Sequence, residues 1–231
     1  MAFEPPVSVE ELESLRRFDT CTVSNAIEAF QIRLRNAGFA YANIRCMFED
    51  FPPMVGYAAT ARLRSGEPPI AGWYHDRTDW WNSILRIPQP RIVVMEDLDE
   101  PPGVGAFLGD MHAAILRALG CVGYVSNGAV RELPRVKALG LHLFAGNVAV
   151  SHAYAHIFDF GSPVKVAGLE VRPGDLLHGD RHGLLTVPKG IASQIPVVAA
   201  KLQQAEKRVI DFCCSQEFSV EKLRRVLEEL S

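Results

Sequence analysis

Residues Gly109 to Glu132 read GDMHAAILRALGCVGYVSNGAVRE, and this stretch contains the strongest candidate site residues of the chain. It contains a helix-length segment, Met111 to Gly120, and then an apolar run of strand length, Val122 to Ser126. A helix that starts at a glycine presents free backbone N–H groups to an anion. The turn after the strand can hold Arg131 and Glu132 beside that helix start. This combination suits a small oxo acid held together with a divalent metal.

Composition limits the class of protein. The chain has 231 residues, 48% of them hydrophobic and 22% charged, with a net charge of -3. This length fits one or at most two globular domains. The charge argues against a protein held to nucleic acid by phosphate contacts. No apolar run reaches the ~18 residues of a membrane span, and residues 1–6 lack the pattern of a signal peptide. We therefore expect a cytoplasmic protein without nucleic-acid or membrane partners.

The five cysteines are Cys21, Cys46, Cys121, Cys213 and Cys214. Their number is odd, and none belongs to a Cys-x-x-Cys pair. Free thiols in a reducing compartment are the simplest interpretation, and we expect no zinc site built on them.

The first third of the chain combines helices with one long strand. Ser8 to Glu11 is a capping box, which predicts a helix to about Arg17. A second helix is expected from about Thr22, and residues 36–53 have a loop composition. Alternation of apolar residues from Val55 to Leu63 predicts a strand.

The middle and end of the chain alternate helices and strands, with Arg64 to Arg77 as a polar segment carrying the aromatic cluster Trp73-Tyr74-His75. The expected elements up to Ala145 are a helix capped by Thr78 or Asp79 that buries Trp81, Ile84 and Leu85, a strand Arg91 to Glu96, a loop Asp97 to Gly105, a helix Leu133 to Leu139, and a strand Leu141 to Ala145. An irregular segment Gly146 to Gly161 and a hairpin around Ala167-Gly168 follow. The chain should end with short strands Leu176-Leu177 and Leu184 to Val187 around a turn at His178 to Gly183, and then helices Ile191 to Phe212 and Ser219 to Leu230.

These elements predict an α/β protein with flanking N- and C-terminal helices. We expect one domain over residues 1–231, with a core at about 20–210 and a helical extension at 190–231.

Each candidate site residue also has an ordinary structural interpretation. Gly109-Asp110-Met111-His112 can be a plain helix start with an acid in its first turn. Arg131 and Glu132 can be a surface ion pair, which is about as probable from sequence alone. We expect His112 to contribute its backbone N–H and not its imidazole.

Two histidine pairs have a spacing of four residues, His152 with His156 and His178 with His182. On a helix, either pair could bind a metal. Neither segment has a helical pattern, so a histidine metal site is not expected.

The motifs together resemble a known family. Gly109 to His112 and Gly123 to Glu132 are similar to the signature of class II pyruvate aldolases of the 4-hydroxy-4-methyl-2-oxoglutarate aldolase type, a family that includes the regulator of ribonuclease activity A. Its motif of Asp, twenty residues, then Arg-Asp reads here as Asp110, twenty residues, then Arg131-Glu132. Residues 171–176 and 180–188 resemble further family motifs.

The resemblance implies a swivelling α/β/β fold in a homotrimer or hexamer. It implies Mg²⁺ or Mn²⁺, with Glu132 as a direct ligand and Asp110 acting through a water. Arg131 and Asp110 would be catalytic, and Arg131 would contact the keto or enolate oxygen. Gly109, Asp110, Met111 and His112 would bind the substrate carboxylate through their N–H groups. The implied activity is cleavage of 4-hydroxy-2-oxo acids to pyruvate, with oxaloacetate decarboxylation as a side activity.

The sequence departs from the family pattern at three positions, since Glu132, Asn127 and Asn25 replace aspartates. The segment Arg64 to Trp81 is also longer than is usual, and we expect it to reshape the pocket entrance. A non-enzymatic, protein-binding member of the same fold is therefore an open alternative.

Overall fold

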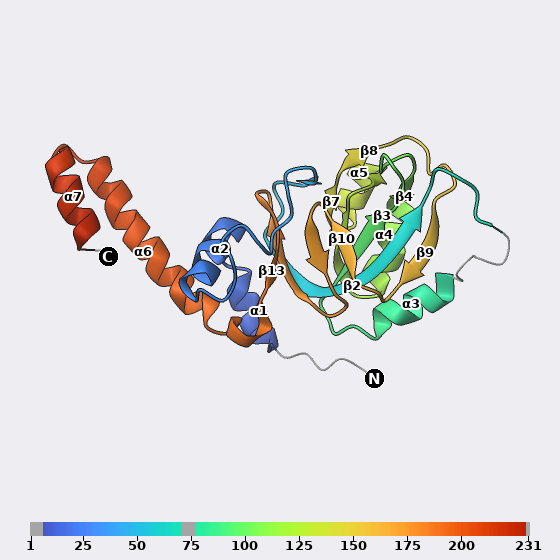
Figure 1. Cartoon of the computed structure of the whole chain (residues 1–231), viewed down its shortest axis with the longest axis horizontal. Coiled ribbons are helices and arrows are strands. Elements are labelled where there is room, and N and C mark those ends of the chain that lie inside the picture. The colour runs from blue at the N-terminus through green and yellow to red at the C-terminus, as the bar shows by residue number, and fades with distance from the viewer. Residues whose placement is uncertain (1–6, 71–76, 230–231) are drawn as a thin grey trace.

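A computed structural model describes residues 7–70 and 77–229. In Figure 1 the strands form the larger body, and α1, α2 and the start of α6 lie together at one side of it. The rest of α6 and α7 extend away from this body as an arm. The predicted α/β architecture with flanking helices is confirmed.

The main sheet is mixed and has the strand order β1-β7-β5-β3-β2-β12-β13, with β9 paired to β2. Neighbours among β2, β3, β5 and β7 are parallel, and the other pairs are antiparallel. The strands of this sheet are β1 (Arg45–Cys46), β2 (Met54–Arg64), β3 (Arg91–Asp97), β5 (Cys121–Ser126), β7 (His142–Ala145), β9 (His156–Phe160), β12 (Leu176–Asp180) and β13 (Gly183–Val187).

Two smaller sheets complete the strand structure. A parallel sheet contains β4 (Ala106–Leu108), β6 (Ala129–Val130) and β8 (Asn147–Val148). A hairpin contains β10 (Val164–Val166) and β11 (Leu169–Val171). Its turn residues Ala167 and Gly168 have φ values of 50° and 79°, which suit a tight two-residue hairpin. The predicted hairpin is confirmed.

Strand β2 is the longest strand and has a hydrophobic core on each face. Alternate residues from Val55 to Leu63 belong to the larger core, as the sequence pattern predicted. Met54 and Ala58 face a second core that includes the β10–β11 hairpin. Because both faces are covered, β2 is the central element of the described structure.

The helices differ in how they begin: the side chains of Ser8, Asp19 and Ser219 cap three of them, whereas Gly109, Glu132 and Gln194 make no side-chain cap for the helices that follow them. They are α1 (Val9–Leu15), α2 (Thr20–Ala29), α3 (Arg77–Leu85), α4 (Asp110–Ala118), α5 (Leu133–Ala138), a 3₁₀ turn η1 (Lys189–Ile191), α6 (Ile195–Cys213) and α7 (Val220–Glu228). The capping box that starts α1 is confirmed. Helix α2 starts two residues before Thr22, because the Asp19 carboxylate accepts the Thr22 N–H.

Several sequence-based predictions were wrong in detail. Residues 36–53 contain β1, and residues 146–161 contain β8 and β9. These short strands exist because tertiary neighbours complete their hydrogen bonds, which local patterns do not show. His178 lies within β12 and not in a turn.

Helix α3 also differs from its prediction. It starts at Arg77, before Thr78, and buries Trp80 and Ile84, while Leu85 is exposed. The predicted aromatic cluster Trp73-Tyr74-His75 lies outside the described residues.

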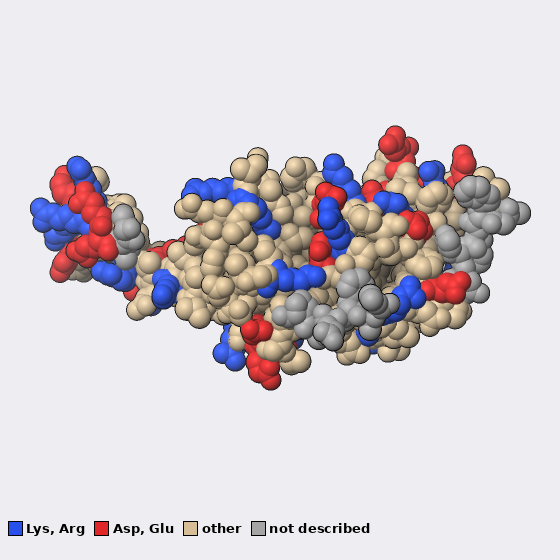
Figure 2. Space-filling view, turned by 60° about the horizontal axis from the view of Figure 1, so that its bottom comes forward, with Lys and Arg blue, Asp and Glu red and all other residues tan. Residues whose placement is uncertain are grey.

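The C-terminal arm makes few contacts with the body. In α6 only Ile195 and Ala199 are fully buried, and α7 has no buried residue. Lys, Arg, Asp and Glu side chains gather on the outer part of the arm (Figure 2). Among the described residues, no helix has the length and apolar character to cross a membrane.

Two histidines lie in the interior of the fold. His142 stacks on Phe144, and burial lowers its pKa to about 4. His178 is fully buried, and burial also lowers its pKa. Its ring nitrogens contact Thr20 Oγ1 at 3.0 Å and the Leu15 carbonyl at 3.3 Å. The fold therefore holds these imidazoles in the neutral form.

We predict that acid destabilises the fold before its carboxylates are protonated. The unfolded chain binds a proton at His142 near pH 6.5, but the folded chain does so only near pH 4. The free energy of unfolding is thus highest above the upper value and falls toward the lower one, by up to about 1.4 kcal/mol per pH unit for each such histidine. Urea denaturation of His142→Phe should show a shallower pH dependence than the parent. The exposed control His152→Gln should keep the parental slope, and an unchanged slope in His142→Phe would contradict the explanation.

Candidate active site

The parallel pairing of β4 with β6 brings the two ends of the signature stretch together. Leu108 pairs with Val130, so the next residues, Gly109 and Arg131, leave the sheet at the same end. The Arg131 N–H donates to the Leu108 carbonyl at 2.9 Å. The twenty residues between Asp110 and Arg131 contain α4 and β5, which return the chain to this point.

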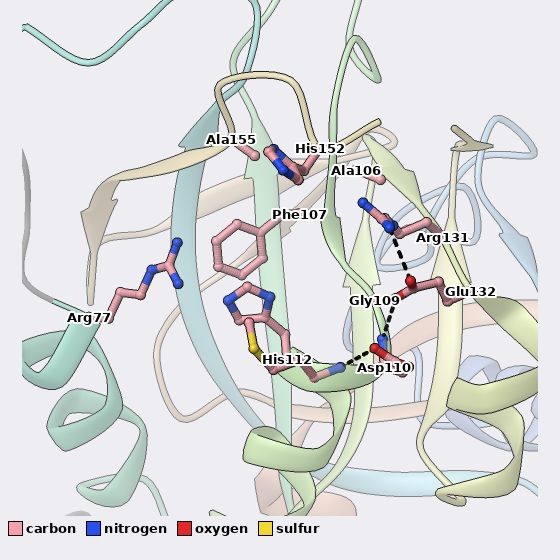
Figure 3. A pocket seen from close by; sticks show the side chains of 11 residues that line it. Arg77, Ala106, Phe107, Gly109, Asp110, His112, Arg131, Glu132, His152 and Ala155 are labelled. Atoms are coloured by element: carbon pink, nitrogen blue, oxygen red, sulfur yellow. Dashed lines mark hydrogen bonds and ion pairs between the residues drawn. The ribbon is translucent and has the colours of Figure 1, made fainter. Parts of the chain in front are cut away.

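A cavity of about 330 Å³ lies at this end of the small sheet. Its lining comes from α3, β4, the start of α4, the residues after β6 and the loop before β9 (Figure 3). The lining residues are Arg77, Ala106, Phe107, Gly109, Asp110, Met111, His112, Arg131, Glu132, His152 and Ala155. The structure therefore brings all the predicted site residues together, and the roles assigned to them remain predictions.

The Glu132 carboxylate occupies the N-terminus of α4. Gly109 is the N-cap residue and has no side chain that could cap the helix. The Asp110 N–H donates instead to Glu132 Oε2 at 3.0 Å. A Cβ at residue 109 would collide with this carboxylate, so the glycine provides the space for it. The anionic group at this helix terminus is the protein's own Glu132 carboxylate. Binding of a substrate carboxylate there stays a prediction.

The backbone of Glu132 is in the left-handed region, with φ 57° and ψ 37°. A non-glycine residue in a sparsely populated conformation costs about 1–3 kcal/mol. The side chain's bond to α4 and the helix α5 that begins at Leu133 hold it there. Such strain is common where a side chain must be aimed at a functional site.

Two arginines pair with the two carboxylates. Arg131 Nη2 lies 3.0 Å from Glu132 Oε1, and Arg135 Nη1 lies 3.1 Å from Asp110 Oδ2. The hydrogen bond from the Arg135 guanidinium lowers the pKa of Asp110 below its usual value. Asp110 is therefore ionised at neutral pH.

The imidazole of His112 is a site group that the sequence analysis missed. Its ring stacks on Phe107 with centroids 4.7 Å apart, and its buried Nε2 has no hydrogen-bond partner in the part of the chain that the structure describes. Burial lowers the pKa of His112 to about 4, and the charge of Arg77 lowers it further. The pocket thus contains a neutral imidazole with an unused polar atom. Its position two residues after Asp110, facing the strand residue Phe107, was the available signal.

Arg77 is the second group that the sequence did not indicate. It projects from the start of α3 toward the pocket, across from Arg131 (Figure 3). Its guanidinium makes no hydrogen bond or ion pair with the other described residues. Among the described residues, this cation on the wall opposite Arg131 has no anionic partner.

The histidine pairs do not form metal sites of their own. His152 lines the pocket, whereas His156 belongs to β9 and borders a different cavity. His178 is buried in β12, and His182 lies at the surface in the turn after it. Neither pair lies on a helix, as the sequence pattern predicted.

The donor set of the pocket fits a hard divalent cation. Asp110 and Glu132 offer carboxylate oxygens on one wall, and each oxygen has lone pairs beyond its present hydrogen bond. Mg²⁺ in proteins is typically held by one or two carboxylates and several waters. A metal ligand role for Glu132 requires its Oε2 to leave the Asp110 N–H or to share its remaining lone pair.

Fold and site together define an α/β/β protein with a pocket that combines a helix N-terminus with two carboxylates. The model of the RraA-like family, described as Aldolase/RraA, matches residues 20–186. The chain therefore belongs to the RraA-like family, as its motifs suggested.

The individual relatives agree with this assignment. A protein of Halalkalibacterium halodurans named "Putative 4-hydroxy-4-methyl-2-oxoglutarate aldolase" is 32% identical over 107 residues, which cover 46% of this chain and 48% of that protein. The match thus spans about half of that relative. The structure of an uncharacterized protein of Pseudomonas syringae pv. tomato superposes with a TM-score of 0.73 at 22% identity, over 97% of this chain and 98% of that one.

A second solved structure connects the fold with a different role. It is the Streptomyces coelicolor protein RraAS2, described as an unusual member of the RNase ES inhibitor RraA protein family. It superposes with a TM-score of 0.69 at 23% identity, over 89% of this chain and 97% of that one. The likeness shows that the two proteins share a fold.

We predict that Glu132 stabilises the protein by capping α4. Glu132→Ala should lower the free energy of unfolding by about 1 kcal/mol, because the Asp110 N–H loses its acceptor. Glu132→Gln should retain most of the stability, since the amide oxygen can still accept. Glu132→Gly should be more stable than the alanine variant by about 1 kcal/mol, because glycine adopts the left-handed conformation without strain. Urea denaturation tests the order, and an alanine variant as stable as the parent would exclude the cap.

Proposed function

We propose that this protein is a divalent-metal-dependent lyase that cleaves 4-hydroxy-2-oxo acids to pyruvate and decarboxylates oxaloacetate. The observation that supports this most is the meeting of Arg131 and Glu132 with Asp110 and the N-terminus of α4 in one pocket. Membership of the RraA-like family and the relative named as an aldolase support the same activity.

Charge balance supports a doubly charged substrate with a divalent ion. The guanidinium groups of Arg77 and Arg131 offset the carboxylates of Asp110 and Glu132 within the pocket lining. A divalent cation and a dianionic oxo acid added together keep that balance. An anion alone would bring excess negative charge next to two carboxylates, which a partly buried site disfavours.

The substrate would be bound at its carboxylate and at its 2-keto group. Its carboxylate would bind the N–H groups at the start of α4, after Glu132 vacates the Asp110 N–H. Glu132 would then hold Mg²⁺ or Mn²⁺ directly, and Asp110 would do so through a water. The bound ion would supply Lewis-acid polarisation of the 2-keto group.

The chain's own groups would carry the remaining chemistry. Arg131 would donate a hydrogen bond to the 2-keto oxygen and stabilise the charge that develops there. As the C3–C4 bond breaks, its electron pair forms the pyruvate enolate, and the 4-hydroxyl proton passes to a water oriented by Asp110. The carbonyl fragment leaves, and a proton added at C3 gives pyruvate. In oxaloacetate, CO₂ leaves through the same enolate.

A non-enzymatic, protein-binding role is the second candidate, and the position of Glu132 favours it. Its carboxylate already satisfies both the helix terminus and Arg131, at 3.0 Å each. A site closed in this way needs neither a metal nor a substrate. Calorimetry with Mg²⁺ and Mn²⁺ separates the two candidates. A regulator should bind neither ion and should retain a protein partner in a pull-down, whereas the lyase should bind the ion and lose it in Glu132→Ala.

We predict that pyruvate release depends on Arg131 and Asp110. A coupled pyruvate assay with 4-hydroxy-2-oxo acids, oxaloacetate and Mg²⁺ or Mn²⁺ should show turnover. Arg131→Ala should lower kcat/KM by about 10²- to 10³-fold, because one donor to the developing oxyanion is lost. Asp110→Asn should also lower it. The exposed control Arg172→Gln should match the parent. Absence of turnover with every acid, or full activity in Arg131→Ala, would refute the proposal.

We further predict that Arg77 selects substrates with a second carboxylate on the leaving half. A charge-assisted hydrogen bond to that group contributes about 1.5–3 kcal/mol, so Arg77→Gln should reduce kcat/KM for dicarboxylic oxo acids by about 10- to 100-fold. Monocarboxylic oxo acids should be affected little. Arg86→Gln, just beyond the other end of α3, is the matched control. An equal loss for both classes of substrate would show that Arg77 does not set specificity.

A further inference from the structure

A second cluster of ligand-type side chains lies where the start of α2 meets the turn between β12 and β13. Asp19 and Cys21 come from the first turn of α2, and His182 comes from the strand turn. Helix α2 packs against both strands, as Figure 1 shows for α2 and β13. None of these residues lines the candidate active site.

The three side chains converge on one point. A carboxylate oxygen of Asp19, the sulfur of Cys21 and a ring nitrogen of His182 all lie within 4.8 Å of one another. Cys21 and His182 are exposed, and Asp19 is half-buried. Within residues 7–70 and 77–229, this is the group of three that brings thiol, imidazole and carboxylate together.

We propose that Asp19, Cys21 and His182 bind Zn²⁺ or a similar borderline divalent ion. Thiolate, imidazole and carboxylate are the ligands that zinc takes in proteins. Thiolate and imidazole disfavour the hard ions Mg²⁺ and Ca²⁺, so this site differs in kind from the carboxylate pocket. Three protein ligands leave a fourth tetrahedral position for a water.

A buried carboxylate behind His182 supports this assignment independently of the three ligands. Asp180 is only 5% exposed. It accepts the Thr20 N–H at 2.8 Å and the His182 N–H at 2.8 Å, and its Oδ1 lies 3.1 Å from His182 Nδ1. When Nδ1 donates to this carboxylate, the lone pair of the imidazole is on Nε2. Histidines that bind metals are usually oriented by such a carboxylate.

The Asp19 carboxylate retains capacity for an ion. It accepts the N–H and the hydroxyl of Thr22, at 2.8 and 3.0 Å, as the cap of α2. A carboxylate has about four acceptor positions, so two remain. The carboxylates of Asp19 and Asp180 make the surroundings of Cys21 negative, which attracts a cation. The ion would join α2 to the β12–β13 turn.

Titration of the metal-free full-length protein with Co²⁺ tests the site. Bound Co²⁺ should produce a thiolate-to-cobalt charge-transfer band and the strong visible absorption of tetrahedral cobalt, and Zn²⁺ should displace both. Cys21→Ser should abolish the charge-transfer band, and His182→Gln should abolish tight binding. Asp180→Asn should weaken Co²⁺ binding by about 10- to 100-fold, the usual effect of removing a partner of a metal-bound histidine.

The controls separate this site from other cysteines and from the pocket. Cys213→Ser removes another exposed thiol and should leave the spectrum unchanged. Glu132→Gln alters the pocket and should also retain the cobalt spectrum, so failure of the proposed lyase activity leaves this result unaffected. Circular dichroism without metal verifies that each variant is folded. The proposal is overturned if no charge-transfer band forms, or if the band persists in Cys21→Ser.

Discussion

The parallel pairing of β4 with β6 is the constraint on which the candidate active site depends. The two strands have only three and two residues, and their paired residues are buried. Since Leu108 and Val130 are neighbours, the helix terminus after one strand and the Arg131-Glu132 pair after the other must meet. A shift in this register would separate the anion-binding N–H groups from the carboxylates that are proposed to hold the metal.

One side chain connects the stability of the site with its chemistry. Glu132 caps α4 and pairs with Arg131, and it does so from a strained backbone position. The additional methylene, relative to the aspartate typical of the family, gives the carboxylate the reach to contact the Asp110 N–H. The same contact that stabilises the helix start occupies the N–H group at which we propose that a substrate carboxylate binds. The proposed enzymatic role requires the Glu132 carboxylate to leave the Asp110 N–H, whereas the non-enzymatic role leaves it in place.

The two candidate metal sites contain different kinds of ligand. The pocket offers carboxylate oxygens balanced by guanidinium groups, which suits Mg²⁺ or Mn²⁺ with an oxo acid. The cluster at the start of α2 offers a thiol and an imidazole supported by the buried Asp180. Thiolate and imidazole ligands suit zinc, whereas carboxylate ligands suit Mg²⁺ and Mn²⁺, so the two clusters differ in the ion that they favour.

The sequence by itself determined the helix from Asp110, the strand after it, the β10–β11 hairpin and the family. These features depend on local periodicity, turn residues and fixed spacing, which a linear pattern records. It also indicated the six residues Gly109 to His112, Arg131 and Glu132, which line one pocket. Only the tertiary structure showed that Glu132 lies on the helix terminus, that Arg77 and His112 face the pocket, and that Asp19, Cys21 and His182 converge. These relations join residues up to 163 positions apart in the chain, and they are set by strand register and helix packing, which local sequence does not encode.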